Sequence, residues 1–65
     1  MERTCAYVQL EDGRIFVQRP TSVFGGMARR AWLQERFGSD AVIEIASPDY
    51  WQILAGNHEV KVVSD

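Results

Sequence analysis

Two runs of alternating apolar and polar residues near the start of the chain constrain its fold more than any other feature. The runs cover residues 7–10 and 14–17, and Asp12 and Gly13 lie between them. An Asp-Gly pair between two such runs is the strongest short-range indication of a β-hairpin, because both residues tolerate the backbone angles of tight turns. The chain is therefore predicted to begin with two antiparallel strands.

A two-residue turn also predicts which side chains share a face of this hairpin, because loop length sets the antiparallel register. Leu10 then faces Ile15. The next pair on the same face is Val8 with Val17, and these four residues form an apolar face. The opposite face carries a mixed aromatic and polar set that suits contact with another molecule: Cys5, Tyr7, Gln9, Phe16 and Gln18.

The length of 65 residues corresponds to one small domain, so residues 1–65 are expected to form a single compact unit. A hydrophobic fraction of 46% is typical of a chain with an ordered core. Because so short a chain has few elements to cover its apolar surface, burial against a partner protein or in a homodimer is an expected source of added stability.

Cysteine content and hydropathy indicate the cellular compartment in which the protein is expected. Cys5 is the single cysteine, so no disulfide forms within one chain and a reducing environment is expected. No apolar run approaches the roughly 20 residues of a membrane span, and residues 1–4 lack the features of a signal peptide. We therefore expect a cytoplasmic protein.

A helix is predicted after the hairpin. Pro20 ends the second strand, because proline cannot donate a hydrogen bond to a neighbouring strand. The helix body is expected at residues 27–37, with Gly38 just past its end, and it begins as early as Val23 if Ser22 is the N-cap.

This helix is apolar on two sides. One broad face is expected to pack on the hairpin: Phe24, Met27, Ala28, Ala31 and Trp32. Leu33 and Phe37 fall on another side, so the helix is either sandwiched between two layers or exposes one apolar side.

The next segments predict a third strand and a second helix. Residues 41–46 are largely apolar, which is typical of a central strand. Ser47 and Pro48 predict a helix start, with Ser47 as the N-cap and Asp49 at the positive end of the helix dipole. The apolar face of this short helix is expected to hold Tyr50, Ile53 and Leu54.

A final strand is predicted at residues 58–63, with Val60 and Val62 on one side and charged residues on the other. The order of elements is then β-β-α-β-α-β. This order indicates an α+β fold in which a mixed or antiparallel sheet is covered by helices, both on one face.

Catalytic and metal-binding patterns are weak in this chain. Cys5 and His58 are the only thiol and imidazole, and no local signature of nucleophilic catalysis surrounds them. One cysteine and one histidine also fall short of the four ligands of a structural zinc site. We expect no enzymatic activity, no cofactor and no metal.

Two patterns favour binding of phosphate or nucleic acid. Gly25 and Gly26 precede Arg29 and Arg30, but no phosphate-binding fingerprint is present. Aromatic residues on a sheet face stack single-stranded bases in some proteins while Arg holds the phosphates. The stacking candidates here are Tyr7 and Phe16, and the phosphate candidates are Arg14 and Arg19. The sequence pI of about 5.2 argues against this alternative, because nucleic-acid-binding modules usually carry a basic surface.

Charge is divided unequally along the chain. Residues 1–37 contain six Arg against four acidic residues, a charge of +2, whereas residues 38–65 contain one Lys against five acidic residues, a charge of −4. A surface formed by the acidic residues of the second half would compete with nucleic acid for a basic groove on another protein. The candidates are Asp40, Glu44, Asp49, Glu59 and Asp65.

These patterns together favour binding to another protein over catalysis. We expect a protein-binding domain, either an inhibitor of the kind that phages and mobile elements encode against host machinery, anti-CRISPR proteins among them, or an accessory subunit. Two conditions apply: aromatic residues count as contacts only if exposed, and Trp32 and Trp51 leave the set if both are buried. The expected contact residues are Tyr7, Phe16, Arg29, Arg30, Arg36, Glu44, Asp49 and Trp51.

Overall fold

A computed structural model describes residues 4–64 as a four-stranded mixed sheet with two helices. The strands stand in the order β3-β2-β1-β4; β1 is antiparallel to both β2 and β4, and β2 is parallel to β3. The predicted order of elements and the α+β class are confirmed. The elements are β1 (Thr4–Gln9), β2 (Ile15–Gln18), α1 (Val23–Phe37), β3 (Ile43–Ala46), α2 (Pro48–Asn57) and β4 (Lys61–Ser64).

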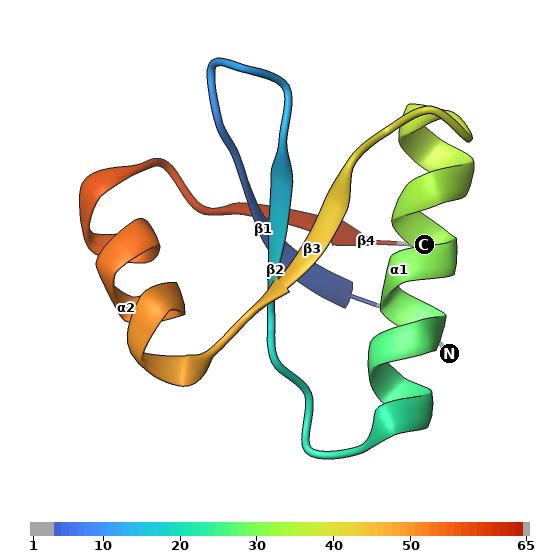
Figure 1. The fold of residues 1–65 in the computed structure, drawn as a ribbon, viewed down its shortest axis with the longest axis horizontal. Coiled ribbons are helices and arrows are strands. Elements are labelled where there is room, and N and C mark those ends of the chain that lie inside the picture. The colour runs from blue at the N-terminus through green and yellow to red at the C-terminus, as the bar shows by residue number, and fades with distance from the viewer. Residues whose placement is uncertain (1–3, 65) are drawn as a thin grey trace.

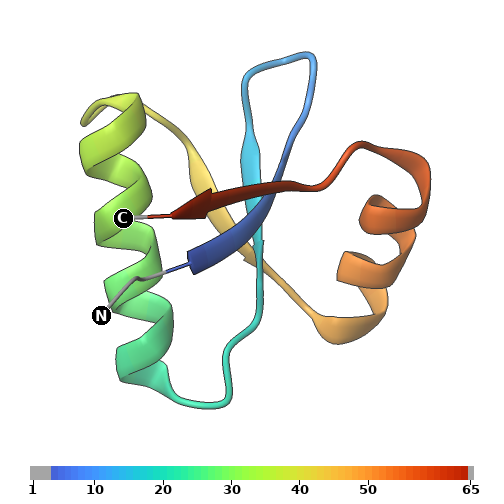
Figure 2. The same cartoon turned by 180° about the vertical axis from the view of Figure 1, so that it is seen from behind.

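The two helices cover opposite faces of the sheet, so the molecule has three layers (Figures 1 and 2). The expectation that both helices share one face is wrong. The connection through α1 leads from β2 outward to β3, whereas the connection through α2 leads back across the sheet to β4. Crossovers of the same hand that run in opposite directions place their helices on opposite faces.

The hairpin forms where predicted, but its loop is one residue longer than a two-residue turn. The Leu10 backbone N–H donates to the Arg14 carbonyl at 2.8 Å, and the Gly13 N–H donates to the Leu10 carbonyl at 3.0 Å. Gly13 has a φ of 91°, so the loop is a turn followed by one left-handed glycine. The observed pairs are therefore Tyr7 with Val17, Val8 with Phe16 and Gln9 with Ile15.

This shift of one residue rearranges the faces of the sheet, because side chains alternate along a strand. Tyr7 shares a face with Val17, and Val8 shares the other face with Phe16. The face under α1 is formed by Cys5, Tyr7, Ile15, Val17, Ile43 and Val63, which pack with Leu33. The face under α2 is formed by Val8, Phe16 and Ala46, which pack with Trp51 and Leu54.

α1 takes the earlier of the two predicted starts. The Ser22 hydroxyl accepts a hydrogen bond from the Gly25 backbone N–H at 3.0 Å, which satisfies one of the free donors of the first turn. The helix buries Gly26 and Leu33, and the Phe37 ring meets the Tyr7 ring edge-on at 5.4 Å. The predicted packing face is wrong, since Phe24 and Met27 are exposed.

The second half also departs from the predictions in three places, the first being that Tyr50 and Ile53 of the expected α2 face are exposed while Trp51 is buried with Leu54. α2 begins as predicted, with the Ser47 hydroxyl accepting from the Tyr50 N–H at 3.3 Å. β3, however, lies at an edge of the sheet and not at its centre. β4 pairs Val63 with Cys5, so Val63 faces the core while Val60 and Val62 are exposed.

Within the described chain, neither α1 nor α2 combines the length and the apolar character of a helix that crosses a membrane.

Candidate protein-docking surface

The outer side of α1 and the flank next to it are apolar and exposed. Val23, Phe24 and Met27 leave 78%, 83% and 63% of their surface accessible. Ala28 and Ala31 continue the same strip and are exposed as well. These five residues are called the α1 surface below.

Helix geometry explains why this strip is left uncovered. At 3.6 residues per turn, Gly26, Leu33 and Phe37 form one narrow row. The α1 surface runs from the flank of the helix, where Val23 and Met27 lie, to the side opposite that row. Gly26 fits against the sheet because it has no side chain; a Cβ there would lie 3.0 Å from Cδ1 of Ile45. α2 lies across the sheet and does not reach the α1 surface (Figure 1).

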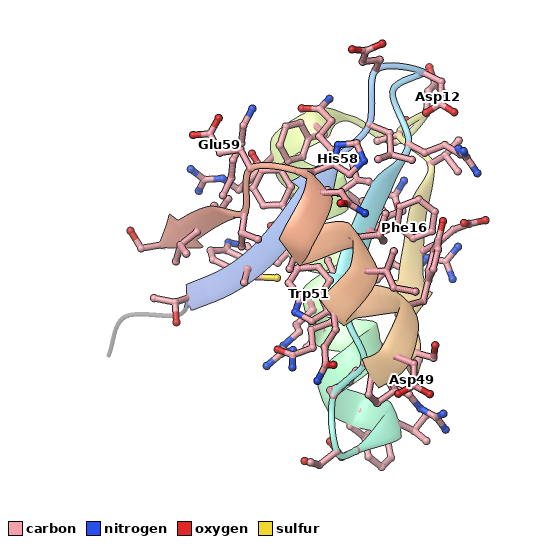
Figure 3. The ribbon with its side chains drawn as sticks, turned by 90° about the vertical axis from the view of Figure 1, so that its left-hand side faces the viewer. Asp12, Phe16, Asp49, Trp51, His58 and Glu59 are labelled. Carbon is pink, nitrogen blue, oxygen red and sulfur yellow. The ribbon has the colours of Figure 1, made fainter. Side chains whose placement is uncertain are left out.

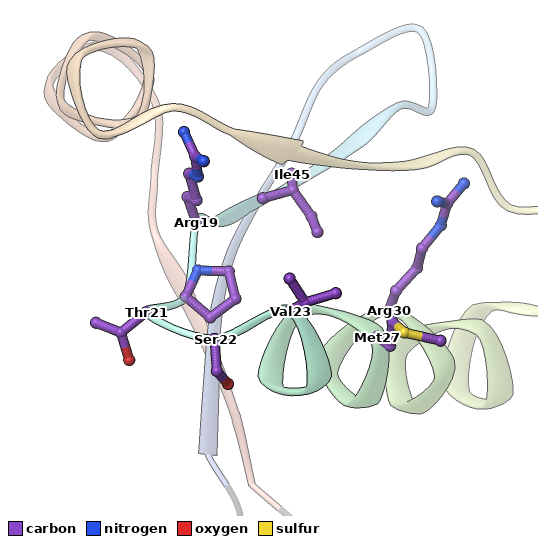
Figure 4. A pocket seen from close by; sticks show the side chains of 9 residues that line it. Arg19, Thr21, Ser22, Val23, Met27, Arg30 and Ile45 are labelled. Carbon is purple, nitrogen blue, oxygen red and sulfur yellow. The ribbon is translucent and has the colours of Figure 1, made fainter.

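A groove of about 290 Å³ separates the first half of α1 from β3 (Figure 4). Its apolar walls are Pro20, Val23, Met27 and Ile45, and the side chain of Ile45 is 41% exposed. Two further hollows border α1, one beside Ala28, Arg29 and Trp32 and the other beside Met27, Arg30 and Ala31. All three of these concave areas thus border α1.

The arginines differ in how they are held. Arg29 donates to the Gln18 carbonyl at 3.3 Å. Arg36 donates to the Ser64 carbonyl at 3.5 Å and lies over the Trp32 ring at 5.7 Å. Arg30, by contrast, makes no ion pair or hydrogen bond through its guanidinium among residues 4–64, and the same is true of Arg19.

Three aromatic side chains that sequence reasoning proposed as contacts belong to the core. Tyr7, Phe16 and Trp51 expose 6%, 4% and 8% of their surface. They are too buried to contact a partner in the folded domain, so the assumption that they are exposed is wrong. Trp32, in contrast, is half-buried.

Burial also removes the predicted base-stacking platform. Tyr7 and Phe16 lie on opposite faces of the sheet, each beneath a helix. The Phe16 ring packs edge-on against Tyr50, with 5.5 Å between ring centroids. Arg14 lies over Phe16 at 5.5 Å and pairs with Asp12 at 2.7 Å. The sheet therefore offers no open aromatic face on which bases stack.

The acidic residues of the second half are exposed but lie on separate elements. Glu44 is on β3 and Asp49 is in the first turn of α2. Glu59 follows the far end of α2, so Asp49 and Glu59 lie at opposite ends of that helix (Figure 3). Asp40 precedes β3, and Asp65 lies outside the described residues.

The structure does not bring Cys5 and His58 together as a reactive pair. The Cys5 side chain is buried under α1, and His58 caps α2 on the other side of the sheet. Burial raises the pKa of the Cys5 thiol above its ordinary value, and the Arg29 charge offsets part of that rise. Among residues 4–64, no three His, Cys, Asp or Glu side chains are grouped as metal ligands would be.

No protein-family model matches the chain, and comparisons with curated proteins and with solved structures find no match.

Sequence reasoning missed Val23 and Ile45 as surface residues and assigned Phe24 and Met27 to the core. The signal that could have found the α1 surface is the apolar character of the helix on two sides, since one layer covers only one of them. Ile45 had no such signal, because its exposure follows from the position of β3 at the edge.

Proposed function

We propose that this domain binds another protein through the α1 surface and acts by docking and not by catalysis. The observation that carries the proposal is the exposure of Val23, Phe24 and Met27 side by side on one helix. Large side chains of this kind are normally buried, and contiguous apolar patches mark interaction sites.

The charged neighbours of the α1 surface fit the same role. Arg30 lies beside Met27, and its guanidinium has no acidic partner in the described part of the chain. Binding energy in protein interfaces is concentrated in aromatic residues and Arg at the centre of an apolar contact. Phe24 and Arg30 supply these two residue types on adjacent turns of α1.

Within this class, the finer hypotheses are a cytoplasmic inhibitor of host machinery, of the phage or anti-CRISPR type, and an accessory subunit. An inhibitor that competes with nucleic acid would use Glu44 and Asp49, which are exposed on elements other than α1. Loss of partner binding in Glu44→Lys or Asp49→Lys would favour the acidic competitor, because those changes reverse charge without touching α1.

The direct test compares tagged wild-type protein with Phe24→Ser and Met27→Ser by affinity co-purification from the source organism. Ile53→Ser is the matched control, because Ile53 is an apolar residue that is 58% exposed on α2. We expect a stoichiometric partner that the wild type and Ile53→Ser retain and that the two α1 variants lose.

Equal retention by all four proteins would place the contact elsewhere and contradict the proposal. Nucleic acid that is released by salt, with no protein partner, would support the alternative of a nucleic-acid-binding module. Light scattering on the purified protein identifies the case in which the partner is a second copy.

A further inference from the structure

The outer edge of β3 has backbone groups that are open for pairing. The Ile15 N–H donates to the Val42 carbonyl at 2.9 Å, and the Arg19 N–H donates to the Ala46 carbonyl at 3.0 Å. In a parallel ladder the residues that bond to the neighbouring strand alternate, so residues 42, 44 and 46 face β2. Ile43 and Ile45 therefore direct their N–H and C=O groups away from the sheet.

No described strand lies beyond this edge, because β3 is the last strand in the order of the sheet. A row of unpaired N–H and C=O groups is a template for pairing with another extended chain. Many peptide-binding domains use such an edge, in which backbone hydrogen bonds give affinity and pockets for alternate side chains give specificity.

The apolar groove lies next to the same edge. Ile45 forms one wall from β3, and Val23 and Met27 form the other from α1 (Figure 4). Because opposite residues of paired strands place their side chains on the same face, a strand added beside Ile45 would direct alternate side chains toward α1. The central one of these would enter the groove.

Arginine side chains stand at the two ends of the groove, Arg19 where β2 ends and Arg30 on the second turn of α1 (Figure 4). Neither guanidinium has a carboxylate partner within residues 4–64. A carboxylate brought to either end would gain a charge-assisted hydrogen bond.

We propose that an extended segment of a partner protein adds to β3 as a fifth strand and places an apolar residue, flanked by acidic residues, in the groove between β3 and α1. This inference rests on the proposed docking function and names the chemistry of the partner. The motif has acidic side chains at its first and fifth positions and an apolar side chain at its third, because every second residue faces α1.

A second copy of this chain fits the groove less well. The acidic residue of its own β3, Glu44, lies between Ile43 and Ile45 in the strand and projects to the face opposite theirs. Pairing of two β3 edges would therefore bring isoleucines and no carboxylate to the groove.

The test titrates ¹⁵N-labelled protein with the capped peptide Ser-Glu-Thr-Ile-Thr-Glu-Ser. We expect chemical-shift changes centred on Ile43, Ile45 and Met27, together with slower amide exchange at Ile43 and Ile45. A peptide in which Lys replaces both Glu is expected to bind several-fold more weakly, as are the protein variants Arg19→Glu and Arg30→Glu. Lys61→Glu, a change of an exposed cation on β4, is the control and is expected to leave binding unchanged.

N-methylated peptides separate strand addition from binding by side chains alone. One peptide carries the methyl group on the central Ile and the other on the two Thr residues. In antiparallel pairing the N–H of the central Ile faces β3, whereas in parallel pairing the N–H groups of the two Thr residues face it. Methylation of the N–H groups that face β3 should abolish binding, and methylation of the other set should leave binding unchanged. Equal binding by both would overturn strand addition, as would shift changes that avoid Ile43 and Ile45.

The failure of this inference is distinguishable from failure of the proposed function. If Phe24→Ser loses the cellular partner while the peptide does not bind, docking on α1 stands and strand addition is wrong. If the peptide binds as expected but the cellular partner is insensitive to Phe24→Ser and Met27→Ser, the groove is a binding site and the α1 surface is not the partner's contact.

Discussion

Gly13 fixes the length of the β1–β2 loop and thereby determines which side chains face each helix. Its φ of 91° lies in the left-handed region, whereas a Cβ at this position would meet no atom within 4 Å. We expect Gly13→Ala to lower the free energy of unfolding by about 1–2 kcal/mol, because the strain comes from the backbone.

Gly56→Ala is the matched control for that measurement by urea denaturation. Gly56 lies in α2 without a positive φ, and a Cβ there also has open space. The helix should gain roughly 0.5–1 kcal/mol from alanine. Similar effects of the two changes would contradict the assigned loop conformation.

The Asp12 carboxylate gives the same loop a dependence on pH. Hydrogen bonds from the Arg14 backbone N–H and, next, its side chain hold the pKa of Asp12 below its ordinary value of 3.8. Because the folded-state pKa is the lower one, the stabilisation is complete above the unfolded pKa and is lost as pH falls through the folded pKa.

Asp12→Asn should therefore be less stable than the wild type at neutral pH, and the difference should shrink under acid conditions. Urea denaturation of both proteins at neutral and at acid pH measures this difference in the free energy of unfolding. A difference that does not change with pH would show that the Asp12 charge plays no part in the loop.

Cys5 is expected to react slowly with thiol reagents in the folded protein. Its side chain is 1% exposed and burial raises the pKa of its thiol, while the thiolate is the reactive form. The rate of modification by a disulfide reagent at neutral pH should rise sharply when urea unfolds the chain. Fast modification without urea would return Cys5 to the set of candidate nucleophiles.

At the scale of elements, the rotation of α1 about its own axis determines which surface is available. Leu33→Ala should lower the free energy of unfolding by about 2–5 kcal/mol, because Leu33 is fully buried. Phe24→Ala removes a larger side chain but should change the free energy of unfolding by only about 0.5 kcal/mol, because Phe24 is 83% exposed. The reverse ranking, measured by chemical denaturation, would mean that α1 packs through the face predicted from sequence.

The two helices show where sequence reasoning succeeded at this scale. Both begin after a serine whose hydroxyl caps the first turn, and such caps are local signals. The buried face of α1 was not predictable in the same way, because its row starts at a glycine that hydrophobicity patterns do not count as core. The close approach of Gly26 to Ile45 requires tertiary structure to be seen.

At the scale of the whole molecule, the error in the hairpin register propagated into the predicted site. With one more residue in the loop, Tyr7 joins the core under α1 and Phe16 joins the core under α2. Arg30 and Glu44 remained on the surface because charged residues are seldom buried whatever the register. The edge position of β3 depends on strand order, which the pattern of one strand does not specify.

The same three-layer arrangement leaves one side of α1 that no element within residues 4–64 covers. Docking on that face is the central claim, and the most direct measurement is the affinity of the co-purified partner for Phe24→Ser relative to Ile53→Ser. A loss of roughly 30-fold or more, about 2 kcal/mol, in Phe24→Ser with little change in Ile53→Ser is the predicted result. Equal affinities for the two variants would contradict it.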